Sequence, residues 1–393
     1  MDQLPKVTVN ILTYNIMEPV PEPIRYYGQK ERTMRVKDVI RNIDEKYHID
    51  VVVLNEVVAL PAQKVIFRDM EEIGFVHHTS KLMGVLSVTG GILLFSKHPI
   101  TQEEISTFGD KCTGIDCFAA KGVVYARMKK ENLYFNVLGT HMQAWPSMAS
   151  QIVRDAQTEQ VAKFIQSINI PRDEPVMFCG DFNIDLYENN DILRHLLHRL
   201  DMDMPEIHED SHPFTVDPKE NKMVGNDDPS EYQTEEWPEG CVEVYYESLE
   251  CPCCPAEWID YALYSKKHLA PISSYMMSIA AKVPPFRMKI NISKHVEIED
   301  VSDHFPLLGH FVFDASGQAG REKRDTLSKD NAELSSNTSH VAFVVVIIVL
   351  VVIIFLGIAW ISFVRWWPKK SASTSTISAD KSKRTRLKST AHG

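Results

Sequence analysis

The chain has 393 residues, of which 44% are hydrophobic, and its formal net charge at neutral pH is −11. This composition is typical of a globular protein and excludes a wholly disordered chain or a coiled coil. The acidic balance argues against a nucleic acid as partner, because a polyanion binds to basic surfaces. No obligatory protein partner is evident from the sequence.

Residues 1–313 alternate between strand and helix patterns and predict one domain. Strands are expected at 7–14, 49–54, 91–96, 122–127, 133–140, 176–179, 258–265 and 306–313, and helices at 31–47, 60–73 and 151–168. Strands outnumber helices and several follow one another directly. This pattern predicts an α/β domain in which sheet packs on sheet and helices lie outside.

The C-terminal part predicts three further segments. Residues 314–340 are polar and predict a flexible linker. Residues 341–364 contain no charge and would form a helix of about 36 Å, enough to span a hydrocarbon core of roughly 30 Å. Residues 365–393 form a basic tail with eight basic residues and one acidic residue, which the positive-inside rule places in the cytoplasm.

These segments predict a single-pass membrane protein whose large domain is extracellular or lumenal. The first ten residues, however, contain no apolar core of a signal peptide. Either the true start lies upstream, or the alternative holds, a tail-anchored protein with its catalytic domain in the cytosol.

Seven cysteines leave the redox compartment open. Four of them cluster at 241, 251, 253 and 254, Cys112 and Cys117 are five positions apart, and Cys179 stands alone. In an exported protein this pattern predicts disulfides, and in the cytosol it predicts a zinc site or free thiols.

Polar, metal-binding or proton-transferring residues follow several predicted strands. They occur in six short motifs: Tyr14-Asn15, Asn55-Glu56-Val57, Gly139-Thr140-His141, Gly180-Asp181-Phe182-Asn183, Ile259-Asp260-Tyr261 and Ser302-Asp303-His304. A single acidic residue at a strand end is usually a turn or capping residue. Six such positions in one chain instead predict a shared cleft at one sheet edge.

Together, these motifs resemble the endonuclease/exonuclease/phosphatase superfamily, which includes DNase I-like nucleases, inositol phosphatases and neutral sphingomyelinases. The resemblance covers residues 6–313 and implies a four-layered α/β sandwich of two packed mixed sheets with outer helices.

Further segments resemble the bacterial sphingomyelinases C. They include Lys121-Gly122-Val123-Val124-Tyr125, His141-Met142-Gln143-Ala144 and Ala256-Glu257-Trp258-Ile259-Asp260-Tyr261. The resemblance implies a phosphodiesterase catalytic domain at 1–313 that hydrolyses sphingomyelin to ceramide and phosphocholine at a membrane surface. One alternative is activity on another phospholipid or an inositol phosphate. A second is an inactive membrane-anchored binding module.

The resemblance also implies a metal site. Glu56 is expected to bind Mg²⁺, for which Mn²⁺ or Co²⁺ could substitute, because hard carboxylate oxygens suit this ion. Asn15 is expected beside Glu56, on metal or phosphate, and Asp303 is expected to contact the metal directly or through water.

Catalytic roles follow from the same resemblance. His304 is the expected general base, because an imidazole titrates near neutral pH, and Asp260 would orient its ring. Asp181 and Asn183 would position the attacking water and a phosphoryl oxygen, and Asp181 is the alternative base. His141 would stabilise the transition state or protonate the leaving alkoxide.

A lipid substrate also requires contact with the bilayer that contains it. Trp145 and Phe286 are the expected membrane-interface residues, because aromatic side chains combine an apolar face with tolerance of a wet rim. Both could equally be core residues.

Overall fold

The computed structural model describes residues 6–18, 28–81, 88–224, 255–289 and 295–318. These residues belong to one compact unit, Met1–Ala319. The predicted linker from residue 319 onward, residues 341–364, the basic tail and the four-cysteine cluster lie outside the described residues.

The first sheet has seven strands and mixes parallel with antiparallel pairs. Its strands, in spatial order, are β12 (Glu206–Ile207), β14 (Ser273–Ser278), β17 (Leu307–Asp314), β1 (Lys6–Glu18), β2 (Val51–Val57), β5 (Leu93–Ser96) and β3 (His77–His78).

The second sheet has six strands and is also mixed. In spatial order these are β11 (Met202–Asp203), β13 (Asp260–Ser265), β10 (Val176–Asp181), β9 (Leu133–His141), β8 (Gly122–Lys130) and β6 (Ile100–Thr107). Two short pairs lie apart from the sheets: β15 (Phe286–Lys289) with β16 (His295–Ile298), and β4 (Val88–Thr89) with β7 (Ala119–Ala120).

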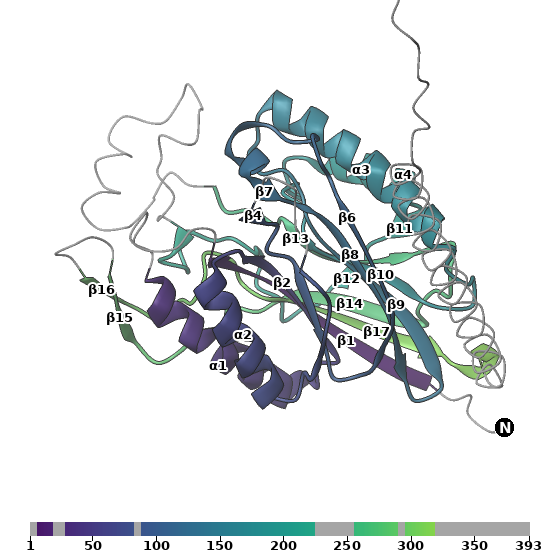
Figure 1. Ribbon diagram of the computed structural model, residues 1–393, viewed down its shortest axis with the longest axis horizontal. Coiled ribbons are helices and arrows are strands. Elements are labelled where there is room, and N and C mark those ends of the chain that lie inside the picture. Colours follow the sequence, from purple (N-terminus) through teal and green to yellow (C-terminus); the bar gives the residue numbers. More distant parts are fainter. Residues whose placement is uncertain (1–5, 19–27, 82–87, 225–254, 290–294, 319–393) are drawn as a thin grey trace, which may run out of the picture. The chain divides into compact units, whose positions relative to one another are not determined.

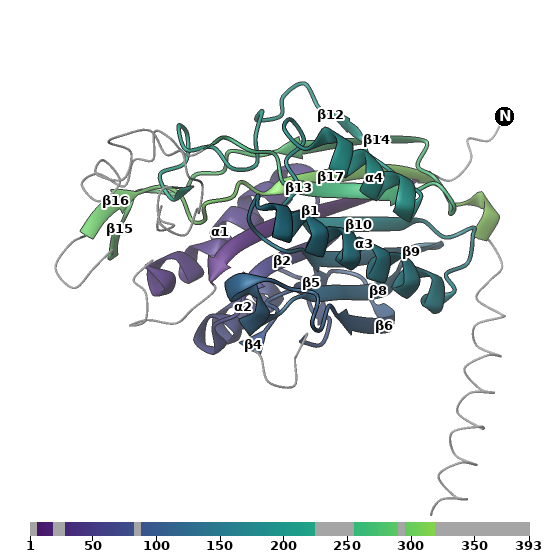
Figure 2. The same cartoon turned by 90° about the horizontal axis from the view of Figure 1, so that it is seen from above.

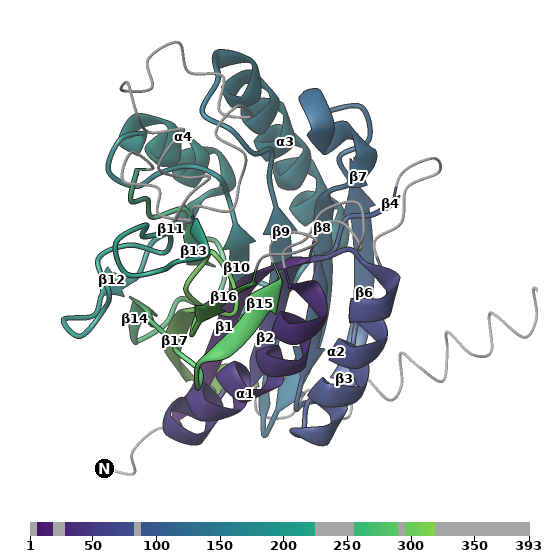
Figure 3. The ribbon, with the colours of Figure 1, turned by 90° about the vertical axis from the view of Figure 1, so that its left-hand side faces the viewer.

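Helices cover the outer side of each sheet, as Figure 3 shows. Against the first sheet lie α1 (Gln29–Tyr47) and α2 (Leu60–Glu72), and against the second lie α3 (Met148–Ile168) and α4 (Asn190–Leu200). Two short 3₁₀ turns complete the described elements, η1 (Gly114–Phe118) and η4 (Ser316–Gln318). The predicted pair of packed mixed sheets is confirmed.

Side-chain alternation along β1 explains the layering. Val9 and Ile11 belong to the core between the two sheets, whereas Leu12 and Tyr14 belong to the core beneath α1 and α2. Successive side chains of a strand point to opposite faces, so a strand covered on both sides is apolar nearly throughout. The sheets approach closely at Gly139, where an added Cβ would lie 2.7 Å from Leu94 Cδ1.

The localisation prediction is contradicted. Among the described residues, no helix is both long and apolar enough to cross a bilayer. The longest one, α3, has 21 residues but carries exposed Glu159 and Lys163 on its outer face, so it covers a sheet with one side only. Hydropathy alone supported the predicted span at 341–364, which lies outside the described residues. Neither the single-pass topology nor its tail-anchored alternative is carried further.

Candidate active site

Strand pairing brings the motif residues to one edge of both sheets. Asn15 on β1 is opposite Asn55 on the parallel strand β2. On the second sheet, Asp181 at the end of β10 is flanked by His141 of β9 and by Asp260 of β13. The two sheets are joined here, because Asn55 Nδ2 donates to the Thr140 carbonyl oxygen at 2.8 Å. In Figure 1, β1 runs toward this end of the fold from the end marked N.

Asn15 connects two carboxylates that come from different sheets. Its Nδ2 donates to Glu56 Oε1 at 3.0 Å and to Asp181 Oδ2 at 3.0 Å. Its Oδ1 accepts from the Met17 amide at 3.0 Å. The amide NH₂ of Asn15 therefore faces the site, whereas the oxygen that would bind a metal is directed to the backbone.

His304 and Asp260 form a buried pair. His304 Nδ1 lies 2.8 Å from Asp260 Oδ2, and its other ring nitrogen, Nε2, lies 3.8 Å from Asp181 Oδ2. The carboxylate thus fixes the ring orientation and leaves Nε2 facing the other acidic groups of the site. This is the orientation required of a base that is positioned by a carboxylate.

A tight turn after β10 positions Asp181 and Asn183. Gly180 has φ of 140°, and an added Cβ there would lie 2.0 Å from the Thr140 carbonyl oxygen, so glycine is required. Asp181 Oδ1 accepts from the Asn183 backbone amide at 2.9 Å, and Asn183 Nδ2 donates to the Met142 carbonyl oxygen at 3.2 Å.

Asp303 lies on the loop that precedes β17. Its Oδ1 accepts from Ser302 Oγ at 3.0 Å. Asn221 holds this loop from the other side, since its Nδ2 donates to the carbonyl oxygens of Ser302 and Asp303 at 2.8 and 3.1 Å. Asp303 is less buried than Asp181 and Asp260.

Lys121 and Asp116 are site residues to which sequence reasoning assigned no role. The buried Lys121 ammonium lies 3.0 Å from His141 Nε2 and donates to Asp116 Oδ2 at 2.7 Å and to the Met142 carbonyl oxygen at 3.0 Å. Asp116 Oδ2 also accepts from the Ala144 amide at 2.7 Å. The signal was available, because Lys121 begins a motif already singled out, but its spatial partners are invisible in sequence.

Two carboxylates of the site, Asp181 and Glu56, have raised pKa values. Burial, followed by repulsion from Asp260, raises the pKa of Asp181 to about 7. Burial and the charge of Asp303 raise the pKa of Glu56. Both shifts mean that ionised carboxylates are crowded here without enough positive charge.

The two histidines shift in opposite directions. Burial, followed by the nearby Lys121 charge, lowers the pKa of His141 well below its usual value, so its ring is neutral. Burial alone would also lower the pKa of His304, but the Asp260 and Asp303 charges outweigh it and raise that pKa well above the usual value.

The donor set fits a divalent cation. Ligand atoms of Asp181, Asp260 and His304 all lie within 4.8 Å of one another, and all three residues are buried. Asp260 Oδ1 is buried and has no hydrogen-bond partner in the described part of the chain. A hard cation would satisfy this oxygen and neutralise the crowded acids, since Mg²⁺ and Ca²⁺ prefer oxygen ligands. The predicted ligand Glu56 joins this cluster through Asn15.

The two predicted membrane-interface residues lie in different surroundings. Trp145 is half-buried beside the His141 motif, and its carbonyl oxygen accepts from Arg154 at 2.8 Å. Phe286 is only 5% exposed and packs under the Arg35 guanidinium, whose carbon lies 4.1 Å from the ring centroid. Phe286 is therefore a core residue in this structure, because the β15–β16 hairpin folds it inward.

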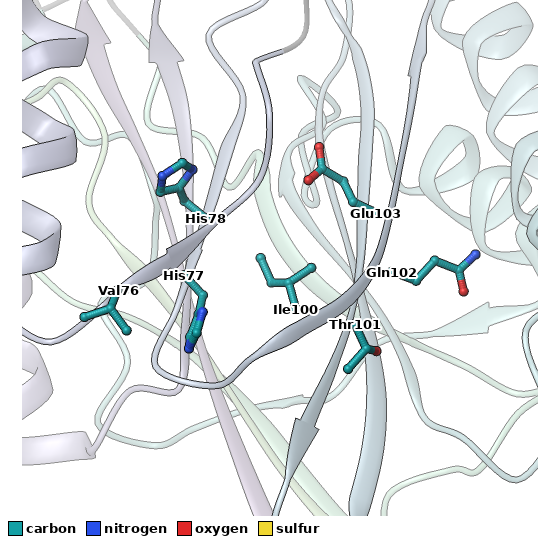
Figure 4. Close-up of a pocket in the computed structure, with 7 residues that line it drawn as sticks. All are labelled: Val76, His77, His78, Ile100, Thr101, Gln102 and Glu103. Atoms are coloured by element: carbon teal, nitrogen blue, oxygen red, sulfur yellow. The ribbon is translucent and has the colours of Figure 1, made fainter. Parts of the chain in front are cut away.

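A separate hollow lies between β3 and β6, the edge strands of the two sheets. Its volume is about 430 Å³, and Figure 4 shows its lining side chains, which are Val76, His77, His78, Ile100, Thr101, Gln102 and Glu103. None of the candidate site residues lines it.

Two of the cysteines form a disulfide. Cys112 and Cys117 are bonded, which closes a short loop around η1, and Cys179 is a buried free thiol. The sequence had left disulfides and free thiols open for these three positions.

The architecture and the site agree with a known family. Residues 12–304 match the model of the endonuclease/exonuclease/phosphatase family. The chain belongs to this family. The match begins within β1 and ends at His304, so it contains all six motifs.

Similar proteins narrow the group within the family. The chain is 27% identical to sphingomyelinase C 2 of Leptospira interrogans over 336 residues. This alignment covers 81% of the chain and 49% of the relative. The chain is also 27% identical over 323 residues to a sphingomyelinase C of Bacillus cereus, covering 76% of this chain and 87% of that protein. The chain thus spans about half the length of the Leptospira relative and most of the Bacillus one. With the family match, these relatives indicate a phosphodiesterase hydrolase, as the motifs predicted.

Solved structures show the same fold. The crystal structure of SmcL superimposes on this chain with a TM-score of 0.63 and 25% sequence identity. The superposition covers 77% of this chain and 99% of the SmcL chain. The structure of Staphylococcus aureus beta toxin with bound magnesium ions superimposes with a TM-score of 0.63 and 22% sequence identity. The superposition covers 78% of this chain and 100% of the beta toxin chain.

Proposed function

We propose that this chain is a Mg²⁺-dependent sphingomyelinase C that hydrolyses sphingomyelin to ceramide and phosphocholine. The observation that supports it most is the buried cluster in which Asp181 Oδ2 meets both the Asn15–Glu56 pair and the His304–Asp260 pair. The relatives named sphingomyelinase C supply the substrate class.

The residues of the chain can divide the reaction among them. In the metal-free site the Asp260 and Asp303 charges keep His304 protonated. When a divalent cation offsets these charges, the ring can lose that proton. Its Nε2 would then accept a proton from the water that attacks phosphorus, while Asp260 holds the ring by its Nδ1. The bond between phosphorus and the ceramide oxygen then breaks. That oxygen would take a proton from a solvent water, and the proton accepted by His304 would return to solvent. Asp181 and Asn183 would orient the attacking water and a phosphoryl oxygen.

Positive charge at the phosphoryl oxygens comes from two sources in this proposal. A divalent cation held by Glu56 and its neighbours would supply Lewis-acid charge there. Lys121 would contribute a fixed ammonium next to the neutral His141. His141 would stabilise the transition state, because a ring that accepts from Lys121 at Nε2 has no proton to donate from that nitrogen.

The test measures phosphocholine release from sphingomyelin vesicles. Glu56→Gln and His304→Ala should each lower kcat at least a thousandfold, and EDTA should abolish activity that Mg²⁺ restores. Mn²⁺ and Co²⁺ are expected to restore part of it. Folding of each variant is checked by its unfolding transition.

A lipid panel at equal surface density separates this proposal from its alternatives. Faster turnover of another phospholipid or of an inositol phosphate would change the substrate while keeping the chemistry. Metal binding without turnover of any phosphodiester would instead indicate a binding module.

A further inference from the structure

Large apolar side chains are exposed at the same end of the fold as the catalytic cluster. Phe118 is 75% exposed, Met148 72%, Ile152 66% and Ile115 58%. Ile115 and Phe118 belong to the η1 loop, and Met148 and Ile152 lie one turn apart at the start of α3. We call these four residues the apolar rim. Figures 1 and 3 show β7, which directly follows η1, and α3 at this end.

Hydrogen bonds join the loop that carries Ile115 and Phe118 to the active site. The Thr113 amide donates to Gln143 Oε1 at 2.9 Å, and Gln143 is two residues after His141. Asp116, between the two rim residues of the loop, accepts from Lys121, which in turn contacts His141. The loop part of the apolar rim is therefore held against the segment that carries His141.

A disulfide restrains the loop part of the apolar rim. The Cys112–Cys117 disulfide closes the loop that presents Ile115 and precedes Phe118. A closed loop has fewer conformations, so less entropy is lost when its apolar side chains are ordered by a partner. In water, by contrast, exposing these side chains is unfavourable.

Charge indicates what the partner is. In residues 112–119 the only charged side chain is Asp116, which is 12% exposed and paired inward with Lys121. Residues 144–152 contain no charged residue at all. An uncharged apolar surface matches a zwitterionic bilayer, and the net charge of −11 opposes binding to an anionic one.

We propose that the apolar rim is a membrane-docking surface that inserts Phe118 and Ile115 into a zwitterionic lipid bilayer and presents the lipid headgroup to the active site. This inference rests on the proposed function for its lipid substrate. It differs from the sequence prediction, in which Phe286 was an interface residue, because the structure buries that ring.

The activity test compares two forms of one substrate. The double variant I115S/F118S should hydrolyse sphingomyelin in phosphatidylcholine vesicles on the order of tenfold more slowly, because each apolar side chain loses its transfer free energy. Its rate on a short-chain sphingomyelin, kept monomeric below its critical micelle concentration, should stay at the wild-type value.

The matched control is Ile272→Ser. Ile272 is 54% exposed, similar to the 58% of Ile115, but it precedes β14 and its amide donates to the Val312 carbonyl oxygen. That position is near the end of β17, away from the catalytic loop. The control should leave both rates unchanged. A parallel loss of the vesicle and monomer rates in the double variant, or no loss of either, overturns the docking proposal.

A second measurement is independent of activity. With EDTA present, phosphatidylcholine–sphingomyelin vesicles should slow amide hydrogen exchange of residues 112–119 in the wild type but not of residues 270–274. Absence of that protection overturns the docking surface, even for an active enzyme. Protection without turnover of any lipid would instead overturn the proposed function alone. Slow amide exchange of residues 112–119 in the absence of vesicles, caused by self-association, would also contradict a bilayer as the docking partner.

Discussion

The two ends of strand β2 place buried acids in opposite electrostatic surroundings. Asp50, just before the strand, accepts from the Asn10 amide at 2.9 Å, from Lys130 at 2.8 Å and lies 2.7 Å from His98 Nε2. Burial alone would raise the pKa of Asp50, but these partners hold that pKa below its usual value. Near the other end of the strand, burial and Asp303 raise the pKa of Glu56.

The difference shows which buried acids serve the fold and which are prepared for a ligand. Asp50 is bonded to a fixed cation, the Lys130 ammonium, so its charge stabilises the native state. Glu56 and Asp181 share a neutral amide, that of Asn15, in place of a cation. A protein keeps such an arrangement at the expense of stability, and crowded acids with raised pKa values are typical of functional sites.

The largest expected effect concerns the His304 pair. Asp260→Asn should lower kcat about a thousandfold, because the ring loses both its orientation and the charge that stabilises its protonated form. KM for the lipid should change little, which steady-state kinetics on vesicles will measure. Asp50→Asn is the control at the other end of β2, and its folded fraction should retain wild-type kcat. Equal loss of kcat in both variants would break the comparison.

The second prediction concerns the stability of the paired end. Asp50→Asn should lower the free energy of unfolding by about 3 kcal/mol at neutral pH, because it leaves the partly buried Lys130 ammonium without its carboxylate partner. The folded-state pKa of Asp50 is depressed, so its stabilisation is present above the unfolded pKa of about 3.9 and is lost as pH falls through the folded value. Urea unfolding across pH should therefore show the difference between variant and wild type shrinking below about pH 4.

The smallest effect has the opposite sign. In EDTA, Asp181→Asn should raise the free energy of unfolding by roughly 2 kcal/mol at pH 8. The raised pKa of Asp181, about 7, means that the folded protein must lose a proton it binds well as pH rises, which destabilises it. The gain should shrink as pH falls below about 7 and disappear below about pH 3, where the acid is protonated in both the folded and the unfolded state. If Asp181→Asn were less stable than the wild type at every pH, the charge of Asp181 would be compensated by its neighbours, as the charge of Asp50 is.

Much of the fold follows from local pattern. Apolar runs such as residues 51–54, within the strand predicted at 49–54, indicate doubly covered strands, and the 3.6-residue spacing in residues 31–47 predicts a helix, since periodicity depends only on neighbouring residues. The strand β6 was missed because six of its eight residues are polar or charged, which is tolerated at a sheet edge. Phe286 was predicted to be a membrane-interface residue but is buried. The sequence of a hairpin does not indicate whether an aromatic side chain points toward the core or toward solvent.

The sequence by itself determined the residue types of the site, the strand ends on which they lie and the family to which the chain belongs. Only the tertiary structure decided which atoms meet: that Asn15 directs its NH₂ to both carboxylates, that Lys121 contacts His141, and that the η1 loop lies against the active site. These contacts join residues from distant parts of the chain. Their geometry depends on how the two sheets pack, and no local pattern encodes that packing.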